Sequence, residues 1–180
     1  MKVSLNWLRR YVDIPVSVEE LCDKMLQAGF EVESVEDLSK SMENVVVGRI
    51  ERMEKHPNAD RLQVCRVDVG AGEPVQVVTG AGNVFEGALV PVALHGSRLP
   101  NGMQIKKGEL RGVESLGMLC SGQELCLKES DYRGAEADGI LILLDDYPPG
   151  TDMRAVLGLD DVIIDFSVTA NRPDCQSILG

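Results

Sequence analysis

The chain has few aromatic residues and no long hydrophobic run. Aromatic residues make up 4% of the 180 residues, so Val, Leu, Ile and Met must fill most of any core. The longest purely apolar run is ILILL at residues 140–144, far short of the roughly 20 residues that a membrane-spanning helix needs. Lys2 is followed by VSLNWLRRYV rather than by the apolar segment of a signal peptide. We therefore expect no membrane association.

The cysteine spacing indicates neither a disulfide framework nor a zinc site. The chain has five Cys, an odd number, so internal disulfides cannot include all of them. No two Cys form a C-x-x-C pair, which is the spacing typical of structural zinc sites. The simplest interpretation is a protein with free thiols in the reducing cytoplasm.

Common catalytic motifs are also missing. No G-x-S-x-G nucleophile elbow is present. The stretch GNVFEGAL has the glycine spacing of a phosphate-binding P-loop, but Ala88 stands where that motif needs Lys. The acidic pairs Asp145–Asp146 and Asp160–Asp161 are interpreted as solvated turn residues. The sequence thus predicts no catalytic residue, metal site or cofactor in this chain.

The middle of the chain has the pattern of a small β-barrel. Fifteen of the 18 Gly lie between Ser39 and Thr151. This segment also holds the short apolar runs VVVGRI, LQVCRVDV, PVQVVTG, LVPVAL and ILILL, which turn residues separate. A change of phase within LQVCRVDV predicts a bulge or sharp bend in that strand. DVGAGEPVQVV predicts a hairpin with its loop at residues 70–73.

The N-terminal segment has a helical pattern instead. Ser17 and Glu20 have the spacing of a capping box, and apolar residues follow at helical intervals. We expect this helix to end at Gly29. A short helix capped by Ser4 is expected before it, and GFEVESVEDL alternates as a strand does.

The C-terminal segment predicts a strand and the start of a helix. DVIIDFSV has the composition of a strand, and Asp174 is placed to cap a helix. Only six residues follow Asp174, and isolated helices of this length are marginally stable. This pattern leads us to expect that the chain is a piece of a longer protein.

These patterns predict a mainly β fold with two domains. We expect residues 1–38 and 151–180 to form a small split α+β domain, with a barrel of residues 39–150 inserted into it. In the alternative, the two ends of the chain do not form one domain, and each is a separate addition to the barrel.

Charge is distributed unevenly along the barrel segment. The net charge of −11 argues against nucleic-acid binding by the whole surface. Residues 49–111 contain nine basic and seven acidic residues, whereas residues 112–150 contain two basic and eight acidic ones. This polarity suits a local basic patch on an acidic body, but ordinary solvated Lys and Arg explain it equally well.

Two basic loops lie where an oligonucleotide-binding (OB) barrel holds its ligand. In that fold the loops between strands 1 and 2 and between strands 4 and 5 contact nucleic acid. HPNADR would be the first loop and HGSRLPNGMQIKKGELRG the second. Because both segments at these loop positions carry basic residues, the sequence predicts a nucleic-acid interface there.

Three sequence blocks of the barrel carry a resemblance to a known family. HPNADRLQVCRVDVG, VTGAGNV and LRGVESLGMLCS resemble the signature blocks of the tRNA-binding domain shared by chaperone-like proteins, EMAP-type cytokine domains and several aminoacyl-tRNA synthetases. MKVSLNWLRRYVDIP and DFSVTANRPDCQSILG resemble the N-terminal region of bacterial phenylalanyl-tRNA synthetase β subunits. The resemblance covers essentially the whole chain.

The resemblance implies a five-stranded OB-fold barrel in an α2β2 ligase. Such an enzyme attaches phenylalanine to its tRNA with ATP and magnesium, in the cytoplasm. Its aminoacylation site is on the α subunit, and its editing and anticodon-binding domains lie beyond residue 180. The implied partners of this chain are tRNA, the α subunit and the remaining β-subunit domains. The chain itself would be catalytically inert.

The resemblance also directs attention to particular tRNA contacts. We expect phosphate contacts at the basic residues of the two loops and weaker contacts at two polar residues. The basic residues are Arg61, Lys106, Lys107 and Arg111, and the polar residues are Asn58 and Ser115. The acidic stretch ELCLKESDYRGAEADG follows and predicts a weak, auxiliary interaction. The alternatives are a structural docking module and a free-standing tRNA-binding chaperone.

Overall fold

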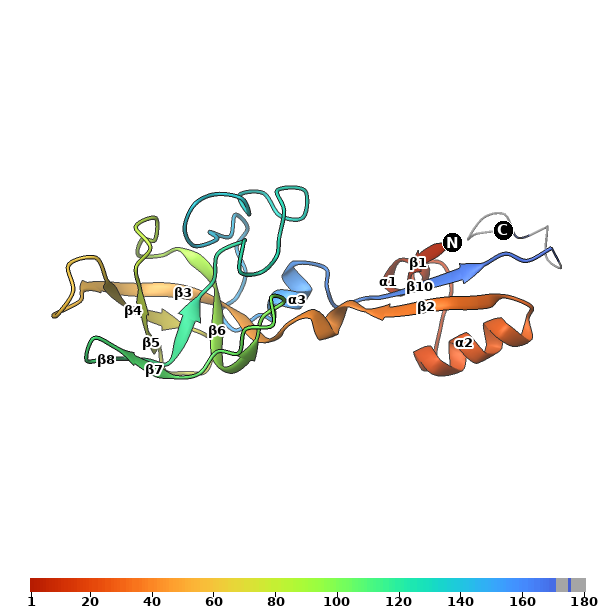
Figure 1. Cartoon of the computed structure of the whole chain (residues 1–180), viewed down its shortest axis with the longest axis horizontal. Helices are drawn as coiled ribbons and strands as arrows, with labels where there is room; N and C mark the ends of the chain where they lie inside the picture. Colours follow the sequence, from red (N-terminus) through yellow and green to blue (C-terminus); the bar gives the residue numbers. More distant parts are fainter. Residues whose placement is uncertain (171–174, 176–180) are drawn as a thin grey trace. The chain divides into compact units, whose positions relative to one another are not determined.

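The computed structural model describes residues 1–170 and residue 175, and it divides the chain into two compact units (Figure 1). The smaller unit contains Met1–Lys40 and the chain from Asp160 onward, and the larger unit is Ser41–Leu159. The helix predicted to begin at Asp174 lies outside the described residues.

The smaller unit is a three-stranded antiparallel sheet with two helices. The sheet has the order β1-β10-β2. Its elements are β1 (Lys2–Ser4), α1 (Leu5–Leu8), α2 (Val18–Gln27), β2 (Glu31–Asp37) and β10 (Val162–Ser167). Val3, Ile164 and Phe166 form the buried centre, and Phe30 meets Phe166 edge-on with ring centroids 5.7 Å apart. The helices predicted after Ser4 and after Ser17, and the strands predicted from GFEVESVEDL and DVIIDFSV, are confirmed.

Helix α2 begins and ends with the predicted local interactions. Ser17 Oγ accepts a hydrogen bond from the Glu20 backbone N–H at 3.2 Å. Gly29 has a φ of 89°, a conformation that glycine adopts without steric cost. The Phe30 N–H donates to the Met25 carbonyl at 2.9 Å, which completes a Schellman motif. The ends of this helix are therefore determined by local sequence.

Asp161 is a structural acceptor near the N-terminus. Its carboxylate accepts hydrogen bonds from the Ser4 hydroxyl and, at 2.9 Å, from the Asn6 backbone N–H. Ser4 Oγ in turn caps α1 by accepting from the Trp7 N–H at 3.0 Å. The interpretation of Asp161 as a solvated turn residue is therefore wrong.

The larger unit is a nearly closed, five-stranded barrel. Its sheet has the order β5-β4-β3-β6-β9, and a hairpin of β7 and β8 precedes the last strand. The elements are β3 (Glu43–Lys55), β4 (Gln63–Asp68), β5 (Val75–Thr79), β6 (Leu89–Arg98), β7 (Gly108–Leu110), β8 (Val113–Ser115), β9 (Gly117–Leu119) and α3 (Met153–Val156), preceded by the 3-10 turn η1 (Leu38–Ser41). The Leu116 N–H donates to the Gln76 carbonyl at 2.8 Å and joins the two ends of the sheet. The predicted OB-type barrel is confirmed.

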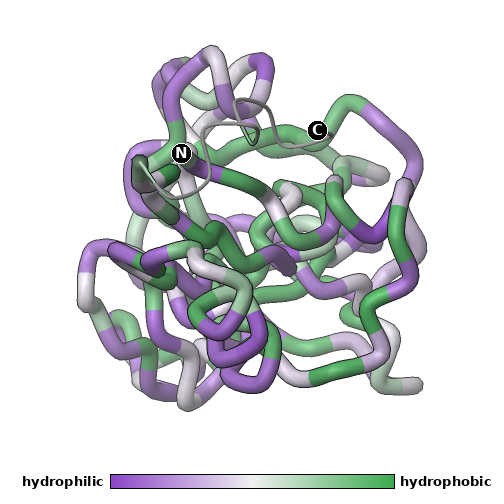
Figure 2. Tube along the Cα trace, turned by 90° about the vertical axis from the view of Figure 1, so that its right-hand side faces the viewer, coloured by the Kyte–Doolittle hydropathy of each residue, from purple (hydrophilic) through white to green (hydrophobic). Residues whose placement is uncertain are grey.

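Aliphatic side chains fill the barrel, as the low aromatic content predicted. The fully buried positions include Val47, Ile50, Val67, Val77 and Val90. Figure 2 shows apolar and polar residues alternating in short stretches along the trace. Among the described residues, no helix is both long and apolar enough to cross a membrane.

The predicted bulge lies in the neighbouring strand. β4 pairs with β5 without interruption, whereas the β3–β4 register shifts between Ile50 and Arg52. Glu51 is thus the extra residue, and it belongs to β3. In β4 itself Cys65 and Val67 are buried in regular alternation, so the bulge predicted for this strand belongs to β3 instead.

The run ILILL is not a strand, and only part of it is buried, since Leu144 is exposed. Leu141 and Leu143 are 2% and 6% exposed. Their N–H groups donate to the carbonyls of Cys120 at 3.1 Å and Leu89 at 2.8 Å, at the edges of the barrel. These single hydrogen bonds do not form a strand ladder. The strand predicted for this run is therefore wrong, and the run packs over the edge of the barrel instead.

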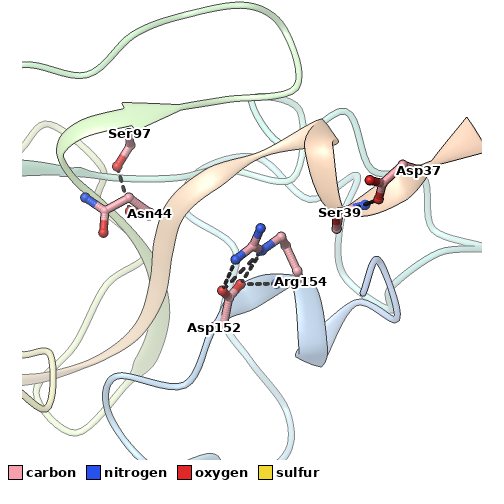
Figure 3. A network of polar contacts seen from close by, with 6 residues as sticks. All are labelled: Asp37, Ser39, Asn44, Ser97, Asp152 and Arg154. Atoms are coloured by element: carbon pink, nitrogen blue, oxygen red, sulfur yellow. Dashed lines mark hydrogen bonds and ion pairs between the residues drawn. The ribbon is translucent and has the colours of Figure 1, made fainter. Parts of the chain in front are cut away.

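Residues 151–159 lie with the barrel unit rather than with the smaller unit. Met153 is fully buried in the barrel core, and the Val47 N–H donates to the Thr151 carbonyl at 2.8 Å. Asp152 caps α3 by accepting from the Arg154 N–H at 2.8 Å (Figure 3). Hydrogen bonds from the Arg154 side chain lower the pKa of Asp152. The expected domain boundary at 150/151 therefore moves to 159/160.

Gly117 is a position where the barrel tolerates no side chain. A Cβ there would lie 2.6 Å from the Ala93 backbone oxygen, whereas a Cβ at Gly82 would meet nothing within 4 Å. Overpacking of this kind costs about 1–3 kcal/mol. We expect Gly117→Ala to lower the midpoint of thermal unfolding by several degrees more than Gly82→Ala, measured by circular dichroism. Equal effects would contradict this packing.

Cysteine labelling tests which thiols the barrel buries. Burial raises the pKa of Cys65 to about 11 and that of Cys120 to about 12, whereas Cys126 is exposed. At pH 8 the two buried thiols are therefore protonated as well as shielded. We expect iodoacetamide to modify Cys126 in the folded protein, and Cys65 and Cys120 only after unfolding, as read by mass spectrometry of peptides. Rapid labelling of Cys120 in the folded state would contradict the burial of this thiol.

Candidate nucleic-acid interface

Two segments far apart in the sequence meet at one end of the barrel. The β3–β4 loop, residues 56–62, contacts the β7–β8 hairpin, residues 108–115 (Figure 1). His56 Nε2 lies 2.8 Å from the Leu110 carbonyl oxygen. Asn58 Nδ2 donates to the Arg111 carbonyl at 2.9 Å. We call these two segments, together with Lys106 and Lys107, the paired loops.

The hairpin turns at Arg111 and Gly112 with an unusual backbone. Leu110 pairs with Val113, so the turn has two residues. Both have positive φ, 49° for Arg111 and 88° for Gly112, as a type I′ turn requires. Asn, Asp or Gly normally occupies the first position, because a left-handed conformation costs other residues roughly 1–2 kcal/mol. The conformation of Arg111 therefore lowers the conformational stability of the hairpin.

The four basic residues predicted from the sequence are exposed on or beside these loops. Arg61 lies in the β3–β4 loop, Arg111 at the hairpin turn, and Lys106 and Lys107 directly before β7. Within the described residues no ion pair involves these four side chains. Acidic partners neutralise the following other arginines of the barrel unit: Arg49, Arg52, Arg98 and Arg154.

The two polar candidates have internal roles. Ser115 is 5% exposed, and its hydroxyl accepts from the Val78 N–H at 3.0 Å and donates to the Gly117 carbonyl at 2.8 Å. It helps to close the barrel, and its burial and internal hydrogen bonds contradict the tRNA contact predicted for Ser115. Asn58 is exposed, but its amide is used to hold the Arg111 carbonyl.

Acidic side chains reduce the positive charge of the paired loops. Glu109 and Glu114 are exposed and directly opposite each other across the β7–β8 hairpin. Like charges in this position are destabilising. Asp60 adds a third carboxylate beside Arg61. The local field is therefore only weakly positive, and the expected weak affinity stays a prediction.

Sequence reasoning missed the roles of the two histidines. In the sequence His56 stands out only as the residue before Pro57, a position that favours an extended backbone. In the structure the Asn58 N–H donates to His56 Nδ1 at 3.0 Å, and the Lys107 N–H donates to His95 Nδ1 at 3.1 Å. Each histidine thus fixes the backbone of a loop that carries basic residues. The two-residue spacing from His56 to Asn58 was the available signal.

The exposed basic side chains of the paired loops are charged hydrogen-bond donors. Among the residues that the structure covers, no group of three or more His, Cys, Asp or Glu side chains is placed to hold a metal ion. Arginine and lysine side chains on paired loops can contact phosphate oxygens, which position a nucleic acid without reading its sequence.

Comparison with known proteins identifies the family. Residues 45–152 match the family described as "Putative tRNA binding domain", which is more than half of the chain. The chain therefore belongs to this tRNA-binding domain family.

The whole chain is also similar to phenylalanine–tRNA ligase beta subunits. It is 47% identical over 180 residues to that of Clostridium acetobutylicum and 50% identical over 185 residues to that of Synechococcus sp. strain CC9605. Each alignment covers 100% of this chain and 22% of the relative. Among solved structures, a MetRS-related protein from Pyrococcus horikoshii matches 59% of this chain and 85% of its own, at 22% identity and a TM-score of 0.40.

Replacement of Arg111 tests whether the turn conformation serves binding. Asn suits the first position of this turn, so Arg111→Asn should raise the free energy of unfolding by about 0.5–1 kcal/mol. The same change removes a cation and should weaken tRNA binding severalfold. Chemical denaturation and tRNA titration measure the two effects. Loss of both stability and binding would contradict the idea that Arg111 is strained for the sake of contact.

Proposed function

We propose that this chain is an auxiliary tRNA-contacting part of a phenylalanine–tRNA ligase beta subunit. The observation that carries the proposal is a set of four exposed cations, which form no ion pair with any residue that the structure describes, on loops that are hydrogen-bonded to each other. Family membership supports it, and so does the similarity of the whole of this chain to 22% of the length of a beta subunit. Arg61, Lys106, Lys107 and Arg111 contact phosphates, and Asn58 holds the loops together.

The expected interaction is electrostatic and modest. Four cations displace counterions from the RNA backbone, which gives binding that weakens as salt increases. Asp60, Glu109 and Glu114 oppose this attraction at the same surface. The chain therefore supplements stronger tRNA contacts made elsewhere in the ligase.

The rest of the ligase supplies the chemistry. The parent enzyme joins phenylalanine to tRNA with ATP and magnesium at a site on the α subunit of an α2β2 assembly, in the cytoplasm. The other partners of this chain are the α subunit and the remaining beta-subunit domains.

A second candidate function is docking within the assembly. Residues 112–150 contain eight acidic and two basic residues, and an acidic surface suits a basic protein neighbour better than RNA. In that case deletion of residues 41–159 from the ligase would weaken subunit assembly and leave its tRNA affinity unchanged.

Titration of this chain with tRNA at several salt concentrations tests the proposal. A triple variant, Lys106→Gln, Lys107→Gln and Arg111→Gln, should bind at least tenfold more weakly. It should also lower the slope of log affinity against log salt by about 2 to 3, since each phosphate contact contributes roughly 0.7 to 0.9. Fluorescence anisotropy of labelled tRNA measures both quantities.

The matched control removes the same charge elsewhere on the barrel. Arg49→Gln, Arg52→Gln and Arg98→Gln together remove three cations that acidic side chains already neutralise. This variant should change the slope by less than about 1. Equal loss in both variants would mean that overall charge, not the paired loops, determines binding. No binding by the unaltered chain at low salt would favour docking.

A further inference from the structure

His56 is a buried polar side chain with a partner at each ring nitrogen. It is 5% exposed. Nδ1 lies 3.0 Å from the Asn58 backbone nitrogen, within the β3–β4 loop. Nε2 lies 2.8 Å from the Leu110 carbonyl oxygen, across in the β7–β8 hairpin. One side chain thus joins the internal turn of one loop to the backbone of the other.

These partners determine the tautomer of His56. A backbone N–H can only donate, so Nδ1 must carry a lone pair facing Asn58. A carbonyl oxygen can only accept, so Nε2 must carry the proton that faces Leu110. A neutral ring protonated at Nε2 meets both requirements. The opposite tautomer would place an N–H against the Asn58 N–H and a lone pair against the Leu110 carbonyl, so both part-buried hydrogen bonds would be lost.

The hairpin that His56 holds carries Arg111. The contacted carbonyl belongs to Leu110, the residue directly before the turn. The next carbonyl, that of Arg111, accepts from Asn58 at 2.9 Å. Gly112 lies close as well, since a Cβ there would be 3.3 Å from Asn58 Nδ2. Two successive carbonyls of a short hairpin are thereby bound to one loop.

We propose that His56 is a positioning residue for tRNA contact: its Nε2–H bond to Leu110 holds the hairpin and its arginine beside the β3–β4 loop. The inference rests on the proposed function, because the arginine it positions is one of the four phosphate contacts. His56 itself does not touch RNA, since it is buried. A fixed spacing between Arg61 and Arg111 lets both reach phosphates without first ordering two loops.

Two substitutions separate the two bonds of the imidazole. The side-chain oxygen of Asn stands the same number of bonds from Cβ as Nδ1, so His56→Asn keeps an acceptor for the Asn58 N–H and loses the bond to Leu110. The amide nitrogen of Gln stands the same number of bonds from Cβ as Nε2, so His56→Gln keeps a donor for Leu110. The two variants therefore differ in which hydrogen bond remains: the one to the Asn58 N–H or the one to the Leu110 carbonyl.

Titration of the full chain with tRNA distinguishes these variants. We expect His56→Asn to bind about fivefold more weakly and to lower the salt slope by about 1, as loss of one well-placed phosphate contact should. His56→Gln should restore binding to within about twofold of the unaltered chain. Equal binding by His56→Asn and the unaltered chain would overturn the proposal, and so would equal losses in the two variants.

A second measurement does not depend on RNA. Nitrogen-15 NMR of the unaltered chain at neutral pH should find the proton of His56 on Nε2 and slow exchange of that proton with water. Protonation at Nδ1 or fast exchange would overturn the positioning role even if tRNA binds. Absence of tRNA binding by the unaltered chain would instead overturn the proposed function, so the two failures are distinguishable.

Discussion

Strand β3 pairs with β4 along one edge and with β6 along the other, and the candidate interface depends on this double pairing. The bulge at Glu51 bends β3 so that the sheet can curve toward closure. The strand ends at Lys55, and His56 follows directly. Closure through Leu116 then brings the β7–β8 hairpin back to this end of the barrel. The site is therefore a consequence of how one strand is paired and bent.

Features that depend on neighbouring residues could be predicted from the sequence. The caps of α2, the Gly29 terminus and the β4–β5 hairpin follow from side chains a few residues apart, so local rules are sufficient. Four of the five apolar runs predicted as strands form β3, β4, β5 and β6, which was enough to predict the barrel. The fifth strand, β9, comes instead from Gly117–Leu119, a segment without a clear strand pattern. The loops of the predicted barrel indicated where basic residues gather.

Features that depend on distant partners could not be predicted. Ser115 resembles a loop hydroxyl in the sequence, and only closure against Val78 buries it. Leu141 and Leu143 have the composition of strand residues. In the structure each N–H makes a single hydrogen bond to the edge of the barrel, and no continuous strand pairing forms. The role of His56 requires the Leu110 carbonyl, which lies 54 positions away in the sequence. Sequence patterns carry no information on such distant pairings.

The paired loops combine interactions that separately would disfavour the hairpin. Arg111 adopts a left-handed backbone, and Glu109 and Glu114 repel each other across the strands. A hairpin chosen only for stability would have Asn at the turn and opposite charges at the paired position. His56 and Asn58 offset these costs with hydrogen bonds from outside the hairpin. A segment that is weak by itself and held by its neighbour is typical of a surface that serves binding rather than folding.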